Sequence, residues 1–247
     1  MKKFWLLPLV AVLIISLAGP STATQYDPPW AHNYGFLYPD GLDTRSHALF
    51  ATNVQDLIFY DANYASNIGA HSAFVNIQDD AVFYVNGHGV SFIDDGTAGG
   101  GVIFYNGTSS LLLAQYTDWL PPDDAYFLSD FSTEINDVLL AVYVACWSGR
   151  TCPHTGNLVD MSASKGIDNV IGFKNSIDNV TSNYWSDRFF YRCKEGFGGQ
   201  HQLIIQAATY AKGDVLLKYQ TYGGVDSLYG KYRTPWGYLD PARYGVV

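Results

Sequence analysis

The sequence is poor in charged residues, and the charges it has are mostly of one kind. Only 15% of the 247 residues are charged, and 14 Lys and Arg residues stand against 23 acidic ones. The acids are nearly all Asp, because Glu occurs only at Glu134 and Glu195. The net charge of −9 and the lack of a basic stripe argue against a nucleic-acid-binding surface. So few charges also exclude a coiled coil or a disordered acidic tail.

Long apolar runs are equally scarce. One extends from Phe4 to Ala18, follows two lysines, and is followed by small residues up to Ala23. This pattern is typical of a signal peptide over residues 1–23, and an uncleaved anchor is the alternative. No later run approaches the ~20 apolar residues of a membrane-spanning helix. We therefore expect a secreted, extracellular protein with no membrane span once the signal peptide is removed.

Glycine and aromatic residues are abundant, with 24 Gly, 19 Tyr and 14 Phe. Such a composition favours a sheet with many turns. No repeat or long linker divides the mature chain, so residues 24–247 are expected to form a single domain. Its core is expected at about 34–214, followed by a Tyr- and Gly-rich C-terminal segment at 219–247 that we do not assign.

Apolar runs alternate with helical patterns along the chain, which predicts an α/β fold with a mostly parallel sheet. Continuous apolar runs predict strands buried on both faces. The predicted strands are 34–38, 58–60, 81–85, 138–144 and 169–173, with a hairpin of 102–105 and 111–113. The predicted helices are 44–57, 68–78, 157–165, 182–195 and 201–212.

Two of the predicted buried strands are each followed by a reactive side chain. His88 comes after the strand at 81–85, and Cys146 after the strand at 138–144. If these strands are parallel neighbours, both side chains lie at the same sheet edge, where ligands bind in such folds. A thiol near an imidazole is a candidate nucleophile. Gly87 and Gly89 leave room for a substrate, and the N–H groups of Gly89 and Cys146 are candidate donors to an oxyanion.

These residues carry a family resemblance. A strand ending in Gly87-His88-Gly89, a hairpin, and a strand ending in Ala145-Cys146 resemble the caspase, legumain and gingipain superfamily of cysteine peptidases (clan CD). The segment from Val144 to Gly149, which reads Val-Ala-Cys-Trp-Ser-Gly, is also similar to the Asp-Ser-Cys-His-Ser-Gly of metacaspases. The resemblance covers roughly residues 34–214 in the order of elements.

The resemblance implies a caspase-like three-layer α/β/α sandwich and an endopeptidase, or thiol protease, that hydrolyses peptides or proteins. Cys146 would attack the peptide carbonyl, His88 would protonate the leaving amine, and the Gly89 and Cys146 amides would hold the oxyanion. The family places the pocket for the residue before the cut in the segment 172–178. The implied substrate-binding residues are therefore Lys174, Asn175, Ser176 and Asp178.

The resemblance does not decide which bond is cleaved. Asp178 would favour a basic residue before the cut and Lys174 an acidic one. Members that cut after Lys or Arg often place an acid two residues before the cysteine, where this chain has Val144. A transpeptidase would use the same Cys–His pair with an amine in place of water.

Other interpretations of the same residues remain open. Three cysteines allow one disulfide; a Cys152–Cys193 pair would leave Cys146 as a thiol, whereas a bridge at Cys146 would rule out catalysis. The spacing of Cys146, Cys152 and His154 matches no standard metal site, so neither a metal nor a cofactor is predicted. The acids at 94–95 and 123–124 are read as solvated loop residues rather than calcium ligands. The alternative function is a non-catalytic extracellular module that binds a protein or a glycan. The sequence predicts no oligomeric state.

Overall fold

The computed structural model describes residues 30–58, 60–91, 98–116, 124–132, 135, 137–195 and 202–232. The predicted signal peptide and the acids at 94–95 and 123 lie outside the described residues, as does most of the C-terminal segment from residue 233 onward. Its strands are β1 (Trp30–Gly35), β2 (Asp61–Ala65), β3 (Val82–Asn86), β4 (Gly89–Ser91), β5 (Ala98–Tyr105), β6 (Ser109–Leu113), β7 (Ala125–Phe127), β8 (Leu140–Val144), β9 (Asn169–Phe173) and β10 (Leu228–Tyr232). Its α-helices are α1 (Arg45–Asp56), α2 (Ala70–Asn76), α3 (Leu158–Ser164), α4 (Asn179–Glu195) and α5 (Ile204–Tyr219).

The main sheet has six strands in the order β10-β9-β8-β3-β1-β2. The five strands from β9 to β2 are parallel, and β10 runs antiparallel to β9 at one edge. A smaller sheet has the order β4-β5-β6-β7. The predicted mostly parallel α/β architecture is therefore confirmed, and β10 adds an antiparallel edge strand.

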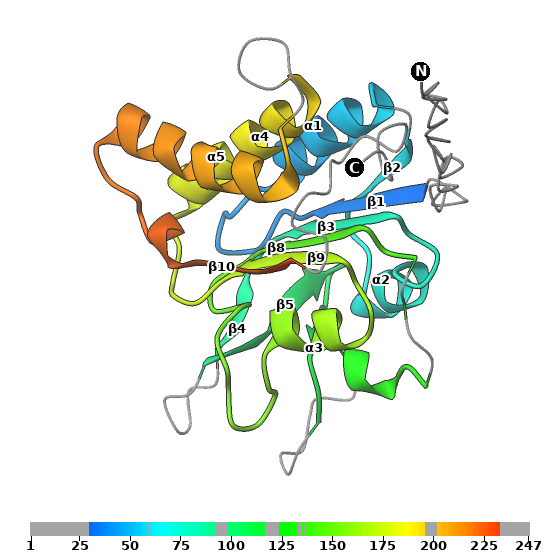
Figure 1. The fold of residues 1–247 in the computed structure, drawn as a ribbon. Coiled ribbons are helices and arrows are strands. Elements are labelled where there is room, and N and C mark those ends of the chain that lie inside the picture. The colour runs from blue at the N-terminus through cyan, green and yellow to red at the C-terminus, as the bar shows by residue number, and fades with distance from the viewer. Residues whose placement is uncertain are drawn as a thin grey trace, which may run out of the picture.

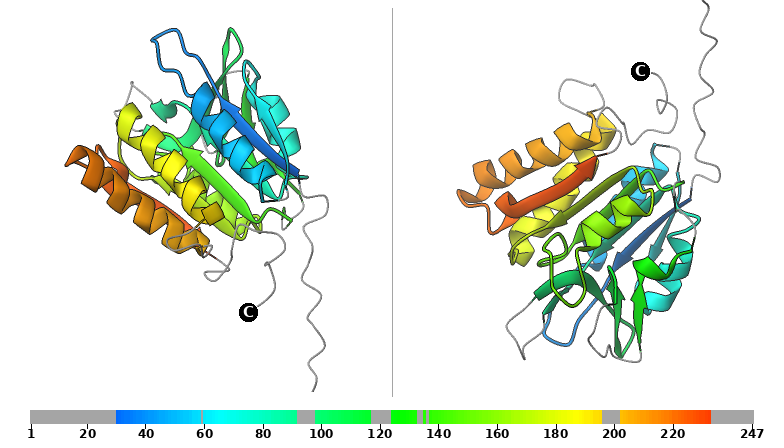
Figure 2. Two further views of the ribbon diagram at one scale, coloured as in Figure 1. Left: turned by 90° about the horizontal axis from the view of Figure 1, so that it is seen from above. Right: turned by 60° about the horizontal axis from the view of Figure 1, so that its bottom comes forward.

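Helices cover both faces of the main sheet, as Figures 1 and 2 show. Helices α1, α4 and α5 lie on one face, while α2, α3 and the small sheet lie on the other. Each interface holds its own apolar cluster, one centred on the rings of Trp185 and Phe189, the other on Tyr34 and Phe104. All five residues of β3, β8 and β9 are buried, as expected for strands between two helical layers.

Three sequence predictions are wrong in position. The strand expected at 34–38 is β1, which begins at Trp30 and ends at Gly35. Of the residues predicted as a strand at 58–60, Ile58 and Tyr60 lie outside any strand, and residue 59 is outside the described residues. Ile58 continues the turn after α1, since its N–H donates to the Gln55 carbonyl. The strand follows at β2, on the sheet edge, where none of its residues is fully buried. Helix α5 does not stop at Lys212 but runs through Gly213 to Tyr219, because Ala211 and Val215 bury one face of it against the core.

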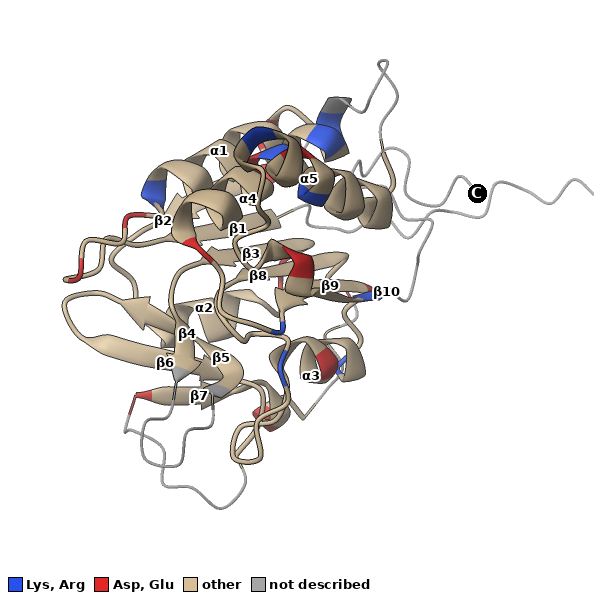
Figure 3. Ribbon diagram, turned by 90° about the vertical axis from the view of Figure 1, so that its left-hand side faces the viewer, with Lys and Arg blue, Asp and Glu red and all other residues tan. Residues whose placement is uncertain are grey.

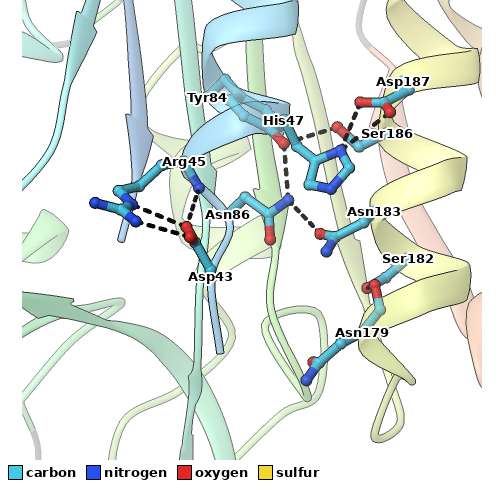
Figure 4. A network of polar contacts seen from close by, with 10 residues as sticks. All are labelled: Asp43, Arg45, His47, Tyr84, Asn86, Asn179, Ser182, Asn183, Ser186 and Asp187. Atoms are coloured by element: carbon cyan, nitrogen blue, oxygen red, sulfur yellow. Dashed lines mark hydrogen bonds and ion pairs between the residues drawn. The ribbon is translucent and has the colours of Figure 1, made fainter. Parts of the chain in front are cut away.

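Polar side chains connect α4 to the end of β3 (Figure 4). The Tyr84 hydroxyl lies 2.7 Å from Oγ of Ser186, and the side-chain amide of Asn86 donates to the Tyr84 hydroxyl and to Oδ1 of Asn183. These four side chains are buried, and each hydrogen bond compensates for water lost on folding. The network fixes Asn86, the last residue of β3.

Polar side-chain contacts join the three helices of this face. His47 on α1 contacts Asp187 on α4 at 2.9 Å, and Asp214 on α5 accepts from both Arg188 and Arg192 on α4. Figure 3 shows basic residues on α4 and α5. No helix within the described ranges is long and apolar enough to cross a membrane.

Candidate functional site

Adjacent parallel strands bring His88 and Cys146 to one edge of the main sheet. Strands β3 and β8 pair in parallel with Asn86 opposite Val144, and each candidate residue follows its strand by two positions. The Gly87 N–H donates to the Val144 carbonyl at 3.1 Å, which extends the pairing past the end of the strands. The two backbones therefore leave the sheet side by side.

The contact is closest at Gly89. A Cβ atom built at this position would lie 1.7 Å from the Cys146 carbonyl oxygen and 2.9 Å from the Cys146 nitrogen. No side chain fits there, so glycine is required for the loop after β3 to pack against the loop after β8. This packing also places the two predicted oxyanion donors, at Gly89 and Cys146, on touching segments.

The imidazole of His88 is held by the loop between β1 and α1. Its Nε2 lies 2.9 Å from Oδ2 of Asp40, and its ring packs edge-on against Tyr38 with centroids 4.4 Å apart. The backbone N–H of His88 donates to the Tyr38 hydroxyl, which in turn donates to the Ile103 carbonyl. With Nε2 facing Asp40, Nδ1 is the ring nitrogen that can exchange a proton with a substrate.

Asp40 is suited to orient this ring. The pKa of its carboxyl is lowered, first by the hydrogen bond that the Leu42 N–H donates to it and then by its contact with His88. The ionised carboxylate is therefore a suitable acceptor for a proton on Nε2. Burial raises the pKa of the Tyr38 hydroxyl, which stays protonated. Neither Asp40 nor Tyr38 was predicted from the sequence as part of this site. Both residues follow β1, which is the neighbour of β3 on the side opposite β8. Their place after a strand of the parallel sheet is the sequence signal that could have indicated them.

The sulfur of Cys146 faces the loop between β9 and α4. Its Sγ accepts from the Ile177 N–H at 3.3 Å, and lies 3.6 Å from Oγ of Ser176 and 3.7 Å from the Ile177 carbonyl oxygen. The side chain is half-buried. The next residue, Trp147, has a left-handed backbone with φ of 57°. Its N–H donates to the Asn175 carbonyl, so the two loops are joined.

The four residues predicted to bind substrate are all exposed, but they differ in what they contact. Ser176 approaches Cys146, whereas the Lys174 ammonium lies over the Tyr229 ring, 4.1 Å from its centroid. The Asn175 N–H donates to Oγ of Ser227. Asp178 caps α4, since its Oδ1 accepts from the N–H groups of residues 180 and 181. The Asp178 carboxylate thus has a structural partner.

The three cysteines are not joined to one another. The Cys152–Cys193 disulfide considered from the sequence is therefore absent. Cys193 lies in the cluster under α4, where burial raises the pKa of its thiol. Cys152 exchanges backbone hydrogen bonds with Gly156 in the loop after β8. Within the described ranges, no group of three His, Cys, Asp or Glu residues is arranged to hold a metal ion.

Known proteins resemble this chain in structure. No family model matches it, and no curated protein matches its sequence. The Arg-specific cysteine proteinase gingipain R aligns with a TM-score of 0.58 at 12% identity, covering 84% of this chain and 46% of its own. The protein has a caspase-like, gingipain-like fold.

A second gingipain structure agrees with this result. The complex of the pro- and mature domains of RgpB from Porphyromonas gingivalis aligns with a TM-score of 0.50 at 13% identity, covering 84% of this chain and 48% of its own. The chain thus spans about half the length of the gingipain chains it matches. At such identities the likeness concerns the fold, and arginine specificity is a property of gingipain R.

Proposed function

We propose that this protein is a secreted cysteine endopeptidase with Cys146 as nucleophile and His88 as general acid and base. The observation that carries the proposal is the pairing of β3 with β8, which places a histidine and a half-buried cysteine at one sheet edge on touching loops. The gingipain-like fold supports it, since that fold is used by a cysteine proteinase.

The reaction uses these groups in two steps. The Cys146 thiolate attacks the carbonyl carbon of the scissile peptide, and the Gly89 and Cys146 N–H groups donate to the oxygen, which becomes negative. The C–N bond then breaks, and His88 gives its Nδ1 proton to the leaving amine. Water, losing a proton to His88, attacks the thioester and releases the acid and the thiolate. Asp40 keeps the ring in position throughout.

The substrate is a peptide or protein segment that lies along the edge of the sheet over the β9–α4 loop. Lys174 and Asn175 in this loop are exposed and are proposed to contact it. Asp178 was predicted from the sequence to bind substrate, but its carboxylate caps α4, so we do not include it among the proposed substrate contacts.

A peptide library tests the proposal. Wild type, Cys146→Ala and His88→Ala, each beginning at residue 24, would be incubated with mixed peptides under reducing conditions, and products read by mass spectrometry. We expect cleavage by wild type, none by Cys146→Ala, and a loss of at least about 100-fold in His88→Ala, as for other general acids and bases. His71→Ala is the matched control, because His71 is an exposed histidine on α2.

The outcome that refutes the proposal is equally clear. Cleavage that persists in Cys146→Ala would show that the nucleophile lies elsewhere. If wild type cleaves nothing in the library while its fold is intact, the non-catalytic binding module becomes the better account.

A further inference from the structure

Three atoms of the β9–α4 loop surround the sulfur of Cys146. They are the N–H of Ile177, the carbonyl oxygen of Ile177 and the hydroxyl of Ser176, at 3.3, 3.7 and 3.6 Å from Sγ. Two of them, the amide and the hydroxyl, can donate a hydrogen bond, and one, the carbonyl, can only accept. The sulfur therefore has suitable partners both with and without its proton.

We infer that Ser176 is a positioning residue for Cys146, which orients the thiolate through a hydrogen bond from its hydroxyl rather than by binding substrate. The inference deepens the proposed function and rests on it for its meaning in catalysis. When the sulfur carries a proton, the Ile177 carbonyl accepts it. When the proton leaves, the Ile177 N–H and the Ser176 hydroxyl both donate to the anion. Hydrogen bonds to the charged form favour that form.

The position of Ser176 is itself fixed from the far side of the loop. The Asn175 N–H donates to the Ser227 hydroxyl, and the Asp178 N–H donates to the Gly223 carbonyl at 2.7 Å. A Cβ atom built at Gly224 would lie 2.1 Å from the Ser176 carbonyl oxygen, so the turn before β10 packs directly behind this residue. The hydroxyl is thus presented to the sulfur by a loop supported on both sides.

Ser176 differs from the other residues of the loop in what its side chain contacts. The Lys174 ammonium is turned to the Tyr229 ring, and the Asp178 carboxylate is turned to the first turn of α4. Among the four residues predicted to bind substrate, Ser176 is the one whose side chain reaches Cys146. Its role should therefore appear in the reactivity of the thiol even when no peptide is present.

The pH dependence of alkylation tests the inference. Wild type, Ser176→Ala and Ser176→Thr would be treated with iodoacetamide between pH 5 and 10, and modification of the Cys146 peptide followed by mass spectrometry. Cys152 and Cys193 are buried and are distinguished by their own peptides. Ser164→Ala is the matched control, since Ser164 is an exposed serine on α3. Thermal melting confirms that each variant is folded.

We expect the pH profile of Cys146 alkylation to change in Ser176→Ala, with a several-fold slower reaction at pH 7. Ser176→Thr keeps the hydroxyl and should behave as wild type. An unchanged profile in Ser176→Ala would overturn the inference, and so would an equal shift in Ser176→Thr.

The experiment also separates this inference from the proposed function. The alkylation profile is read without a peptide substrate. A shift in Ser176→Ala together with no cleavage by wild type would refute the peptidase and leave the positioning of the thiol intact. Cleavage by wild type with no shift in Ser176→Ala would overturn the role of Ser176 and leave the proposed peptidase intact.

Discussion

Oδ2 of Asp40 lies 2.9 Å from Nε2 of His88, although the two residues are separated by the whole of α1, β2, α2 and β3. The contact forms because β1 and β8 flank β3 in the sheet, so that the loops after all three strands meet at one edge. It places the Asp40 carboxylate against the His88 imidazole, at the sheet edge that also carries Cys146.

Replacing Asp40 should slow peptide cleavage. In Asp40→Asn the amide cannot stabilise an imidazolium, so we expect kcat to fall by about tenfold with a smaller change in KM. Steady-state kinetics on a peptide identified in the library would measure it. Asp43→Asn is the control, because Asp43 lies in the same loop but pairs with Arg45. Equal losses in the two variants would contradict an orienting role for Asp40.

Removing the Tyr38 hydroxyl should affect both stability and activity. Tyr38→Phe keeps the ring packed against His88 but deletes the group that accepts the His88 N–H and donates to the Ile103 carbonyl. We expect the free energy of unfolding to fall by ~1 kcal/mol. We also expect a few-fold loss in kcat. Urea titration and kinetics test the two effects, and a variant with unchanged stability would show that the hydroxyl contributes little.

Replacing Gly89 with alanine should destabilise the fold and abolish cleavage. The Cβ of Gly89→Ala would overlap the Cys146 carbonyl, so the two loops must separate. We expect a loss of ~3 kcal/mol or more in the free energy of unfolding, together with loss of cleavage. Gly213→Ala is the matched control: nothing lies within 4 Å of its Cβ, and in helix α5 it should stabilise by ~0.5–1 kcal/mol. A well-folded, active Gly89→Ala variant would contradict the close packing.

Asp80 should make stability depend on pH. Burial raises the pKa of its carboxyl from 3.8 to about 6, while the hydrogen bond to His32 opposes this rise. Between these two values the folded state holds the proton and the unfolded state has lost it. The contribution of Asp80 to stability is therefore full below pH 4 and is lost as the pH rises through 6.

Asp80→Asn should remove this loss. The amide oxygen can still accept from His32, and the amide does not titrate. We therefore expect the difference in free energy of unfolding between Asp80→Asn and wild type to be about 2 kcal/mol more favourable to the variant at pH 7.5 than at pH 4. Urea unfolding at the two pH values measures it, and the exposed neighbour Asp79 provides the control variant Asp79→Asn. A gain that is the same at both pH values would exclude titration of Asp80 as the cause.

The core of the fold was predictable because its signal is simple. Residues 81–85, 138–144 and 170–173 consist of aliphatic and aromatic residues and one glycine, and a run of this kind between turns has few alternatives to a strand buried on both faces. The hairpin of β5 and β6 was equally clear, since Asn106-Gly107 marks its turn. His88 and Cys146 were found because they follow two of these runs.

The remainder depends on tertiary contacts that no local pattern records. Strand β10 is half-exposed and has no apolar run, so only its pairing with β9 defines it. Asp40 lies in a turn, where Asp is common for purely local reasons, and its partner is 48 positions away. Asp178 was read as a determinant of specificity, and its local role as the cap of α4 became clear only in the structure.

The turn at 223–227 is synthesised after the other segments of the candidate site. During synthesis His88, Cys146 and Ser176 all leave the ribosome before this turn, yet Gly223 and Ser227 supply the hydrogen bonds that fix the loop beside the sulfur. A nascent chain that ends before residue 223 contains every group proposed to react but lacks the support that aligns them. The thiol thus acquires its final surroundings only after strands β1 to β9 have been synthesised.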